Sequence, residues 1–474
     1  MNIAIFLSIA ATTASPSSAF IFISPISNRY HVSSQYKSTI YTTNVQHTKT
    51  CSHTNNNLQQ RFNELCLYNS KSEIDNDSNS IDRALLKTMN ILSANFKSHA
   101  LHAFVQLNIP NIMGDRSMSI DQIATELSKS ADLGGDSDRH INKDALLRTM
   151  RLLKMIDVVN EEYVTTNFEH DVLEKEEDTK DVLSSSLEIE ILKFQLTSYG
   201  KLLQSTDGSK HGGTGSNISS CILHWMEKPL DSAWHKLPDY ILGDPSDPFT
   251  QTNGLSSDYF YNINDNPQSL EYANDFVKLI SDIEIQSIVK YFDWSALDGK
   301  TIVDIGGYNG KVLGEIASHY PNTRLTLKSL DLPQVISSID KSTIPTDVEL
   351  IEGDVMKPST IPPCDVIFMK HFLDRCMWTE EETVNILKTC SNIISGSNGM
   401  IILGEAVIPS GRNEEANEEG IRLSLDALYM LVGRERQRTR FEWKDLAERA
   451  NLQISEIIAT SSASCYVLVL TNKT

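Results

Sequence analysis

The chain has 474 residues, of which 40% are hydrophobic and 22% are charged, and its formal net charge is −20. This length accommodates two domains that each bury a core, and the composition is that of a soluble globular protein. The acidic balance argues against nucleic acid or an anionic membrane as a partner. Seven cysteines without a Cys-x-x-Cys pair argue against a disulfide framework and a structural zinc site, so no metal centre is expected.

The first 19 residues have the pattern of a signal peptide. Residues 3–11 form a short apolar run, and Ser17 and Ala19 place small residues where a signal peptidase cleaves. The segment before the run lacks a positive charge, which departs from the usual pattern. Apart from this departure, the pattern predicts a signal peptide over residues 1–19.

The segment that follows, residues 20–75, has the composition of a transit peptide or a disordered stretch. From residue 20 to residue 63 it contains no Asp or Glu, and Ser, Thr and Asn are frequent. The string PSSAF at residues 16–20 also resembles the junction of two-part presequences in algae with secondary plastids, where a signal peptide precedes a transit peptide. We therefore expect a plastid protein, and a secreted or cytoplasmic location is the alternative.

Residues 80–170 have the pattern of a small, mainly helical domain. Apolar residues recur at helical spacing in four stretches, and the third stretch opens with a capping-box sequence from Ser119 to Gln122. Pro110 is expected to end the second helix. The apolar positions that define the four helices are Ala84, Leu85, Met89 and Leu92; Leu101, Phe104, Val105 and Leu107; Ile123, Ala124 and Leu127; and Ala145, Leu146, Met150, Leu152 and Leu153.

A small hairpin is expected after the last helix, with Val158 and Val159 in one strand and residues 163–166 in the other. Helices followed by a two-stranded wing predict a winged-helix domain, a shape that binds DNA in other proteins. Because the whole chain is strongly acidic, dimerisation is a better interpretation of this domain than DNA binding.

Residues 171–269 are expected to form linker helices that carry part of a small-molecule pocket. Within them, residues 205–220 (STDGSKHGGTGSNISS) have the low complexity of a flexible surface loop. Four aromatic and histidine residues follow at a spacing compatible with one helix face: His224, Trp225, Trp234 and His235. Such residues either pack in the core, which is the default, or line the pocket for the substrate.

Residues 270–474 have the alternating strand and helix pattern of an α/β domain. Between Thr301 and Val335, an apolar run ends in an acid and two glycines, a helical stretch follows, and a second apolar run ends at Asp331. A strand, a glycine turn, a helix and a strand are the first half of a doubly wound, nucleotide-binding sheet.

The glycine turn favours S-adenosylmethionine over NAD as the ligand. Tyr308 stands where the dinucleotide fingerprint G-x-G-x-x-G has its second glycine. The spacing found here, Asp-x-Gly-Gly-x-x-Gly, lets the backbone pass beside the amino-acid tail of S-adenosylmethionine, and Asp304 can accept a hydrogen bond from that tail. Gly306 and Gly307 provide the space, so these three residues are the first predicted cofactor contacts.

Further polar residues end the strands that follow, at the edge where open α/β sheets bind ligands. Asp331 is expected to accept from both ribose hydroxyls, and Asp354, with Val355 after it, is expected at the adenine. The fourth strand leads to Lys370, and the fifth ends at Glu405. Taken singly, such acids are surface or capping residues, but together on one edge they predict a cofactor site.

With these motifs, the chain resembles the plant-type and acetylserotonin-type O-methyltransferases from about Ala84 to its C-terminus. The matching stretches are VDIGGYNG (303–310), SLDLPQVI (329–336), EGDVMKP (352–358), DVIFMKHFLD (365–374), IILGEAVIP (401–409) and RTRFEWKDLAERANL (438–452). The resemblance implies an α/β fold: a doubly wound, mostly parallel Rossmann-like methyltransferase sheet with an N-terminal, mainly helical winged-helix dimerisation domain. It also implies a homodimer, a small-molecule methyl acceptor, and S-adenosylmethionine as cofactor, with contacts at Gly306, Asp331, Asp354 and Lys370.

The chain departs from this family at the catalytic histidine. In the family, the histidine of a His-Asp-Trp stretch deprotonates the acceptor hydroxyl, and its position falls on Asp374 here, followed by Arg375. One partner acid is retained as Glu405, while Gln437 stands at the position of the second, unless Glu435 takes that role. His371 lies three residues before Asp374 and is interpreted as a packed or solvated histidine, not as the base.

These residues leave the methyl-accepting atom open between oxygen and sulfur. Aspartate, with a pKa of about 3.9, is a poor base for a phenol or alcohol unless burial raises its pKa. A thioether has no proton to lose, and Asp374 and Glu405 would stabilise the sulfonium that it forms, while Arg375 would hold an acceptor carboxylate. These three are the predicted catalytic residues.

The leading interpretation is a small-molecule methyltransferase of the O-methyltransferase family. The alternative acceptor is a thioether such as 4-methylthio-2-hydroxybutyrate, which similar algal and bacterial proteins methylate on the route to dimethylsulfoniopropionate. A catalytically lapsed, S-adenosylmethionine-binding dimeric scaffold and a winged-helix DNA-binding protein are alternatives of other classes.

Overall fold

The computed structural model describes ten stretches of the chain. These are residues 79–130, 140–168, 187–204, 218–262, 267–373, 378–394, 399–409, 416–434, 436–462 and 464–473. The predicted signal and transit peptides, residues 1–75, lie outside them. The described residues fall into two units, 79–94 and 95–473. In these stretches no helix combines the length and the apolar character that crossing a bilayer needs.

The N-terminal helices differ from the predicted ones in number. The two helices expected between Ala84 and Leu107 are one continuous helix, α3 (Asn79–Gln106), because no glycine or proline interrupts the sequence between them. Pro110 does not end that helix but lies in the first turn of α4 (Ile109–Met113), where proline is tolerated.

The other two helices confirm the sequence pattern. They are α5 (Ile120–Lys129) and α6 (Lys143–Lys154). The capping box at Ser119 is present, since the backbone N–H of Gln122 donates to Ser119 Oγ and the N–H of Ser119 donates to Gln122 Oε1. The buried side chains Phe104, Met113, Ile123, Met150 and Phe194 form part of one core.

This region also contains a three-stranded sheet. Its strands, in spatial order, are β1 (Met118–Ser119), β3 (Leu187–Leu196) and β2 (Val159–Phe168). The hairpin predicted within residues 158–166 is wrong, because β2 runs through the expected turn and pairs antiparallel with β3 over its whole length. Its partner strand comes some 20 residues later than the sequence suggested, inside the segment expected to hold only linker helices.

Short helices connect this region to the second sheet. They are α7 (Ser198–Lys201), α8 (Ile218–Trp225), α9 (Lys228–Ala233), η3 (Trp234–Lys236), α10 (Leu237–Ile241), α11 (Pro248–Asn253) and α12 (Ser257–Asn262). Residues 218–220 of the predicted loop are helical, and 205–217 lie outside the described residues. The four residues expected on one helix face are divided, since His224 and Trp225 end α8 whereas Trp234 and His235 belong to η3.

The C-terminal part of the chain alternates helices and strands. The helices are α13 (Pro267–Tyr291), η4 (Trp294–Leu297), α14 (Lys311–His319), α15 (Pro333–Ser338), η5 (Lys341–Thr343), η6 (Pro358–Thr360), α16 (Glu380–Ile394), α17 (Ala416–Leu431) and α18 (Arg440–Arg449). The strands are β4 (Thr301–Ile305), β5 (Thr326–Asp331), β6 (Val348–Glu352), β7 (Val366–Lys370), β8 (Met400–Glu405), β9 (Leu452–Ala459) and β10 (Tyr466–Asn472).

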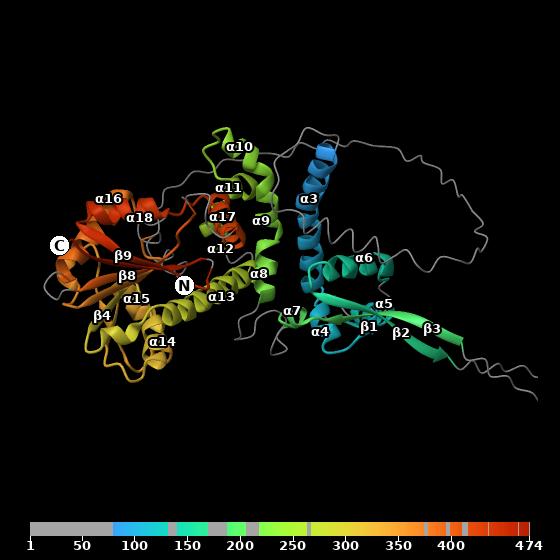
Figure 1. The fold of residues 1–474 in the computed structure, drawn as a ribbon, viewed down its shortest axis with the longest axis horizontal. Coiled ribbons are helices and arrows are strands. Elements are labelled where there is room, and N and C mark those ends of the chain that lie inside the picture. The colour runs from blue at the N-terminus through green and yellow to red at the C-terminus, as the bar shows by residue number, and fades with distance from the viewer. Residues whose placement is uncertain are drawn as a thin grey trace, which may run out of the picture. The chain divides into compact units, whose positions relative to one another are not determined.

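These strands form a sheet of order β6-β5-β4-β7-β8-β10-β9, which is seen beneath α16 and α18 in Figure 1. The first five pair in parallel, and β10 runs antiparallel to both of its neighbours. This confirms the predicted doubly wound, mostly parallel α/β fold. The strand order reverses between β4 and β7, and the crevice at the carboxyl ends of these two strands is where such sheets bind ligands.

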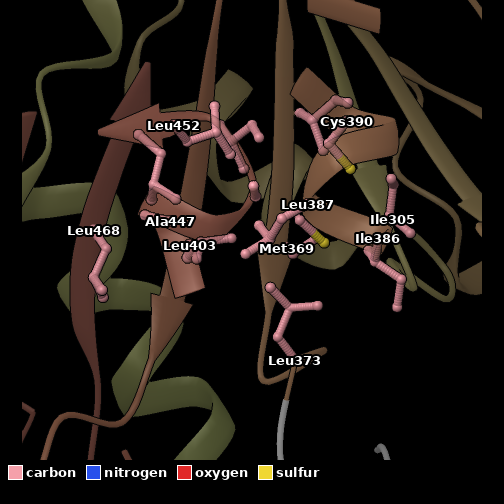
Figure 2. Packing of buried hydrophobic residues seen from close by; sticks show 14 of the residues in the cluster. Ile305, Met369, Leu373, Ile386, Leu387, Cys390, Leu403, Ala447, Leu452 and Leu468 are labelled. Carbon is pink, nitrogen blue, oxygen red and sulfur yellow. The ribbon is translucent and has the colours of Figure 1, made fainter. Parts of the chain in front are cut away.

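The strands carry apolar side chains on both faces, which explains why helices cover both faces of the sheet. One face packs against α16 and α18, and Figure 2 shows Ile305, Met369 and Leu403 of the strands meeting Leu387 and Cys390 of α16. The other face packs against α13 and α14. The two layers hold the strand ends, and therefore the residues that follow them, in fixed positions.

Candidate cofactor and acceptor site

The glycine turn after β4 is built so that only glycine fits. Gly306 has a φ of 76°, and a Cβ there would lie 2.6 Å from the ring of Phe372. A Cβ on Gly307 would lie 2.5 Å from Ser329 Oγ and 2.6 Å from Asp304 Oδ2. The turn therefore brings the three predicted residues Asp304, Gly306 and Gly307 together at the switch point between β4 and β7.

Asp304 carries a buried carboxyl group that the protein leaves incompletely bonded. The residue is 2% exposed, and its Oδ2 has no hydrogen-bond partner among the described residues. Burial, and then the charge of Asp331, raise the pKa of this carboxyl well above its usual value. A buried oxygen without a partner needs an explanation, and a ligand N–H group at the glycine turn supplies one.

Asp331 lies at the end of β5 and fastens the turn to that strand. Its Oδ1 accepts from the backbone N–H of Leu332 at 2.8 Å, and its Oδ2 accepts from that of Tyr308 at 3.1 Å. Burial raises the pKa of Asp331, and the two backbone hydrogen bonds oppose this rise. The predicted ribose-binding acid is therefore next to the glycine turn, as the sequence pattern requires.

Asp354 and Val355 follow the edge strand β6. Asp354 Oδ1 accepts from the backbone N–H of Met356 at 2.9 Å, and Lys357 Nζ lies 3.4 Å from Oδ2. Val355 is buried in the core beneath α16. The predicted adenine-side residues thus lie on the same sheet edge as Asp331, one strand further out.

Lys370 belongs to a buried cluster of charges that the sequence did not predict. Its Nζ lies 2.7 Å from Glu284 Oε2 of α13, and His371 Nε2 lies 3.0 Å from Glu284 Oε1. His371 Nδ1 faces Glu405 Oε2 at 3.7 Å, while Glu405 Oε1 accepts from the backbone N–H of Leu373 at 2.9 Å. Two cations and two carboxylates from α13, β7 and β8 therefore meet at the edge of the sheet.

The charges in this cluster decide what His371 can do. Burial would lower the pKa of His371, but the charge of Glu284 and the hydrogen bonds to Glu284 and Glu405 together raise that pKa to about 9. Burial would raise the pKa of Glu284, but His371 and Lys370 hold it below its usual range. His371 is therefore a buried imidazolium at neutral pH, which agrees with its interpretation as a packed histidine and not as a general base.

Of the three predicted catalytic residues, the structure places one. Glu405 is 1% exposed at the end of β8, and it is bonded to the backbone just before the segment that contains Asp374. Asp374 and Arg375 lie outside the described residues. Beside the segment, the buried Arg438 donates to the carbonyl of Leu373.

Comparison with known proteins shows what the chain is similar to. The O-methyltransferase domain model matches residues 234–453. The chain is 28% identical over 316 residues to norreticuline-7-O-methyltransferase of Papaver somniferum, covering 66% of this chain and 77% of the relative. It is 26% identical over 382 residues to (RS)-norcoclaurine 6-O-methyltransferase of Thalictrum flavum subsp. glaucum, covering 79% and 94%. Residues 234–453 are therefore similar to an O-methyltransferase domain, and both relatives are plant O-methyltransferases.

Solved structures of methyltransferases share the fold. CalO1, a methyltransferase of calicheamicin biosynthesis solved with S-adenosylhomocysteine, covers 85% of this chain and 100% of its own with a TM-score of 0.60 at 20% identity. Human N-acetylserotonin methyltransferase, solved with S-adenosylmethionine, covers 85% and 99% with a TM-score of 0.54 at 16% identity. These likenesses confirm the fold class predicted for this chain.

The site fits S-adenosylmethionine, the methyl donor of the family. The two glycines leave room at the switch point, and the unpartnered oxygen of Asp304 is an acceptor for an ammonium group. Asp331 lies at the neighbouring strand end, where a carboxylate accepts ribose hydroxyls in doubly wound sheets. The sequence pattern predicted these residues because each lies at the end of an apolar strand or directly after it. It missed the bonds of Glu284, because they join residues 86 and 87 positions apart.

Proposed function

We propose that this protein is an O-methyltransferase that transfers the methyl group of S-adenosylmethionine to a hydroxyl oxygen of a small aromatic acceptor. The observation that carries the proposal is the glycine turn at the switch point, with its unpartnered Asp304 oxygen. The names of the relatives, which include caffeic acid 3-O-methyltransferase of Medicago sativa, support a phenolic acceptor. A thioether acceptor and a lapsed scaffold have no comparable support.

The residues of the chain have separate roles in this proposal. When bound, the cofactor supplies a methyl group that an oxygen nucleophile attacks. Asp304 would accept from its ammonium group, Asp331 from its ribose hydroxyls, and Asp354 and Val355 would hold its adenine. Lys370 is paired with Glu284, so we assign it a supporting role behind the cofactor. The family's base position is occupied by Asp374, which together with Arg375 and Glu405 completes the proposed catalytic set.

Two measurements test this function. Calorimetry with S-adenosylmethionine is expected to show binding to one site per chain, and absence of binding would contradict the proposal. Transfer of labelled methyl from S-adenosylmethionine to a panel of phenols, alcohols and thioethers is expected to label phenolic oxygen. Label on thioethers alone would instead assign sulfur as the acceptor atom, and binding without transfer would favour the scaffold.

The catalytic role of Asp374 has its own test. Asp374→Asn keeps the size of the side chain and removes its charge, so we expect unchanged affinity for S-adenosylmethionine and a fall in kcat of about 100-fold or more. Steady-state kinetics and calorimetry on the same preparation measure both quantities. Full turnover by Asp374→Asn would remove Asp374 from the mechanism.

We also propose that the protein is a homodimer and that it works in a plastid. The dimer is supported by exposed apolar residues on α3, among them Ile81, Leu85, Met89 and Leu92. The location is supported by the composition of residues 1–75. A fluorescent fusion to residues 1–75 in an alga with secondary plastids is expected to enter the plastid, and its retention elsewhere would contradict this location.

A further inference from the structure

A cavity of about 690 Å³ lies between the end of α3, the helices α8 and α9, and the first turns of α13. All the residues that line it belong to the unit of residues 95–473. Its volume is within the range of small-molecule sites, which is about 300–1,000 Å³. Leu107, Leu223 and Met226 give it apolar walls, and the ring of Tyr272 adds an aromatic one. The cavity therefore has room for a ligand with an apolar body.

This cavity is separate from the cofactor site. Ser269 of α13 borders the cavity, whereas Glu284 of the same helix faces Lys370 at the edge of the sheet. At a rise of about 1.5 Å per residue, Ser269 and Glu284 are about 22 Å apart along α13. The methyl acceptor of the proposed function has to reach the cofactor, so a small ligand in this cavity is a different molecule.

Glu227 contributes a buried carboxylate to the wall of the cavity. Its side chain is only 10% exposed. The hydroxyl of Tyr261 donates to Glu227 Oε1 at 2.7 Å, and His224 Nδ1 lies 2.9 Å from the same oxygen. Among the described residues, Oε2 has no hydrogen-bond partner. A buried carboxylate with an unbonded oxygen is unfavourable unless a donor or a positive charge approaches it.

Asp231 adds a second carboxylate to the same cavity. Burial and the charge of His99 lower the pKa of His102, and the charges of Asp231 and Glu227 oppose this decrease. Because such effects decrease with distance, both acids lie near His102 and therefore near each other. Within the stretches that the structure describes, Asp231 has no hydrogen-bond partner, so its oxygens can accept from a ligand.

The positive charges around the cavity do not cancel these two carboxylates. His102 is neutral at neutral pH, because its pKa lies below the usual value of 6.5. Lys228 borders the cavity, but it is exposed, and in the described part of the chain it forms no ion pair with either acid. Water and salt therefore screen its charge. The cavity combines apolar walls with an excess of negative charge.

We propose that this cavity binds an organic ammonium ion that carries an apolar body. The ammonium group donates to Glu227 Oε2 and to the carboxylate of Asp231, because three N–H donors can serve both acids. The apolar body lies against Leu223, Met226 and the ring of Tyr272. The ligand is neither the cofactor nor the methyl acceptor, so the inference goes beyond the proposed function and does not depend on it.

The test compares 2-phenylethylamine with 2-phenylethanol, which differ only in an ammonium group and a hydroxyl group. Neither compound has a phenolic hydroxyl, so neither is an acceptor of the proposed reaction. Calorimetry on the full chain at neutral pH is expected to show about tenfold tighter binding of the amine, because its ammonium group bonds to charged oxygens. The same affinity is expected in the presence of S-adenosylhomocysteine, since the two sites are separate.

Two variants identify the acids that bind the amine. Asp231→Asn and Glu227→Gln each remove one charge and keep the size of the side chain, and the amide oxygen of Glu227→Gln can still accept from Tyr261. We expect each variant to reduce the preference for the amine to about twofold and to leave the affinity for the alcohol unchanged. Asp239→Asn removes the same charge at an exposed position of α10 outside the cavity and is expected to keep the full preference.

Four results would overturn the inference. The first is equal affinity of the unaltered protein for the amine and the alcohol. The second is an unchanged preference in both Asp231→Asn and Glu227→Gln. The third is an equal loss of preference in Asp239→Asn, since net charge alone would then attract the amine. The fourth is transfer of labelled methyl from S-adenosylmethionine to the amine, which would place the amine at the cofactor and not in this cavity.

Discussion

At the scale of single residues, the proposed contact between Asp304 and the cofactor would couple cofactor binding to the release of a proton. Burial and the charge of Asp331 raise the pKa of this carboxyl, so the free protein holds its proton to a higher pH than an exposed aspartate does. An ammonium group at Oδ2 favours the charged carboxylate and lowers the pKa in the complex. Because the pKa is higher in the free state, affinity is complete above that pKa and is lost as the pH falls through it.

We therefore predict that S-adenosylmethionine binds more weakly as the pH is lowered and that its binding releases protons. Calorimetry in two buffers of different ionisation enthalpy measures the number released. Asp304→Asn, which has no proton to release, is expected to bind more weakly and without this release. Asp340→Asn changes an aspartate far less buried and serves as the control. Equal proton release from Asp304→Asn and the unaltered protein would exclude Asp304 as the coupled group.

Gly307 leaves space beside Asp304 at the proposed cofactor site. In Gly307→Ala the new Cβ would lie 2.5 Å from Ser329 Oγ and 2.6 Å from Asp304 Oδ2, so the turn must move. We expect a loss of about 1–3 kcal/mol in the free energy of unfolding and weaker binding of S-adenosylmethionine, measured by denaturant titration and calorimetry.

Gly420→Ala is the matched control for Gly307→Ala. Gly420 lies in α17, and a Cβ there meets no atom within 4 Å. This variant is expected to be more stable by up to about 1 kcal/mol and to bind the cofactor normally. Similar effects of the two substitutions would mean that the turn is not closely packed.

At the scale of elements, the imidazolium of His371 joins α13 to β7 and β8. Its pKa is about 6.5 in the unfolded chain and about 9 in the fold, because Glu284 and Glu405 together overcome the effect of burial. A shift of this size corresponds to a stabilisation of the order of 3 kcal/mol. Since the folded pKa is the higher one, the stabilisation is complete below about pH 6.5 and is lost as the pH rises through about 9.

The expected result is a protein whose free energy of unfolding decreases from pH 6.5 to pH 9.5. His371→Gln is expected to be less stable at pH 6.5, and its free energy of unfolding is expected to change much less with pH over this range. Urea titrations at several pH values measure both. The control His319→Gln, at an exposed position of α14, is expected to keep the decrease. If the free energy of unfolding of His371→Gln decreased as steeply with pH, the decrease would be caused by another group.

The elements that the sequence predicted well are those specified by local patterns. The strands from β4 to β8 are rich in apolar residues and carry polar residues at or near their ends, and Asp331 and Glu405 lie at the strand ends where the sequence pattern placed them. The capping box at Ser119 is likewise a local signal.

Two of the errors concern structure that is determined by contacts between distant parts of the chain. The partner of β2 comes only with β3, and the bonds of Glu284 to Lys370 and His371 depend on the packing of α13 against the sheet. The continuity of α3 was missed for a different reason. Two apolar groups suggested two helices, although no residue between them breaks a helix. The pairing of β2 with β3 and the bonds of Glu284, by contrast, are long-range contacts, which produce no periodic pattern in the sequence.

At the scale of the whole molecule, net charge and an exposed apolar face have opposite effects on dimerisation. Each chain carries a formal charge of −20, which disfavours the approach of a second copy and is screened by salt. On α3, Ile81, Leu85, Met89 and Leu92 are between 53% and 75% exposed. They fall within a stripe of about 80° on the helix, which is the pattern of a surface that packs against another helix.

We predict that the protein is a dimer whose stability increases with ionic strength, because salt weakens the repulsion while the apolar contact remains. Leu85→Glu with Met89→Glu places two carboxylates on the stripe and is expected to give monomers in sedimentation equilibrium. Lys87→Glu changes the net charge by the same amount on the opposite side of α3, so it should weaken the dimer only slightly. If both variants dissociated equally, charge alone would control assembly, and the stripe on α3 would not be the interface.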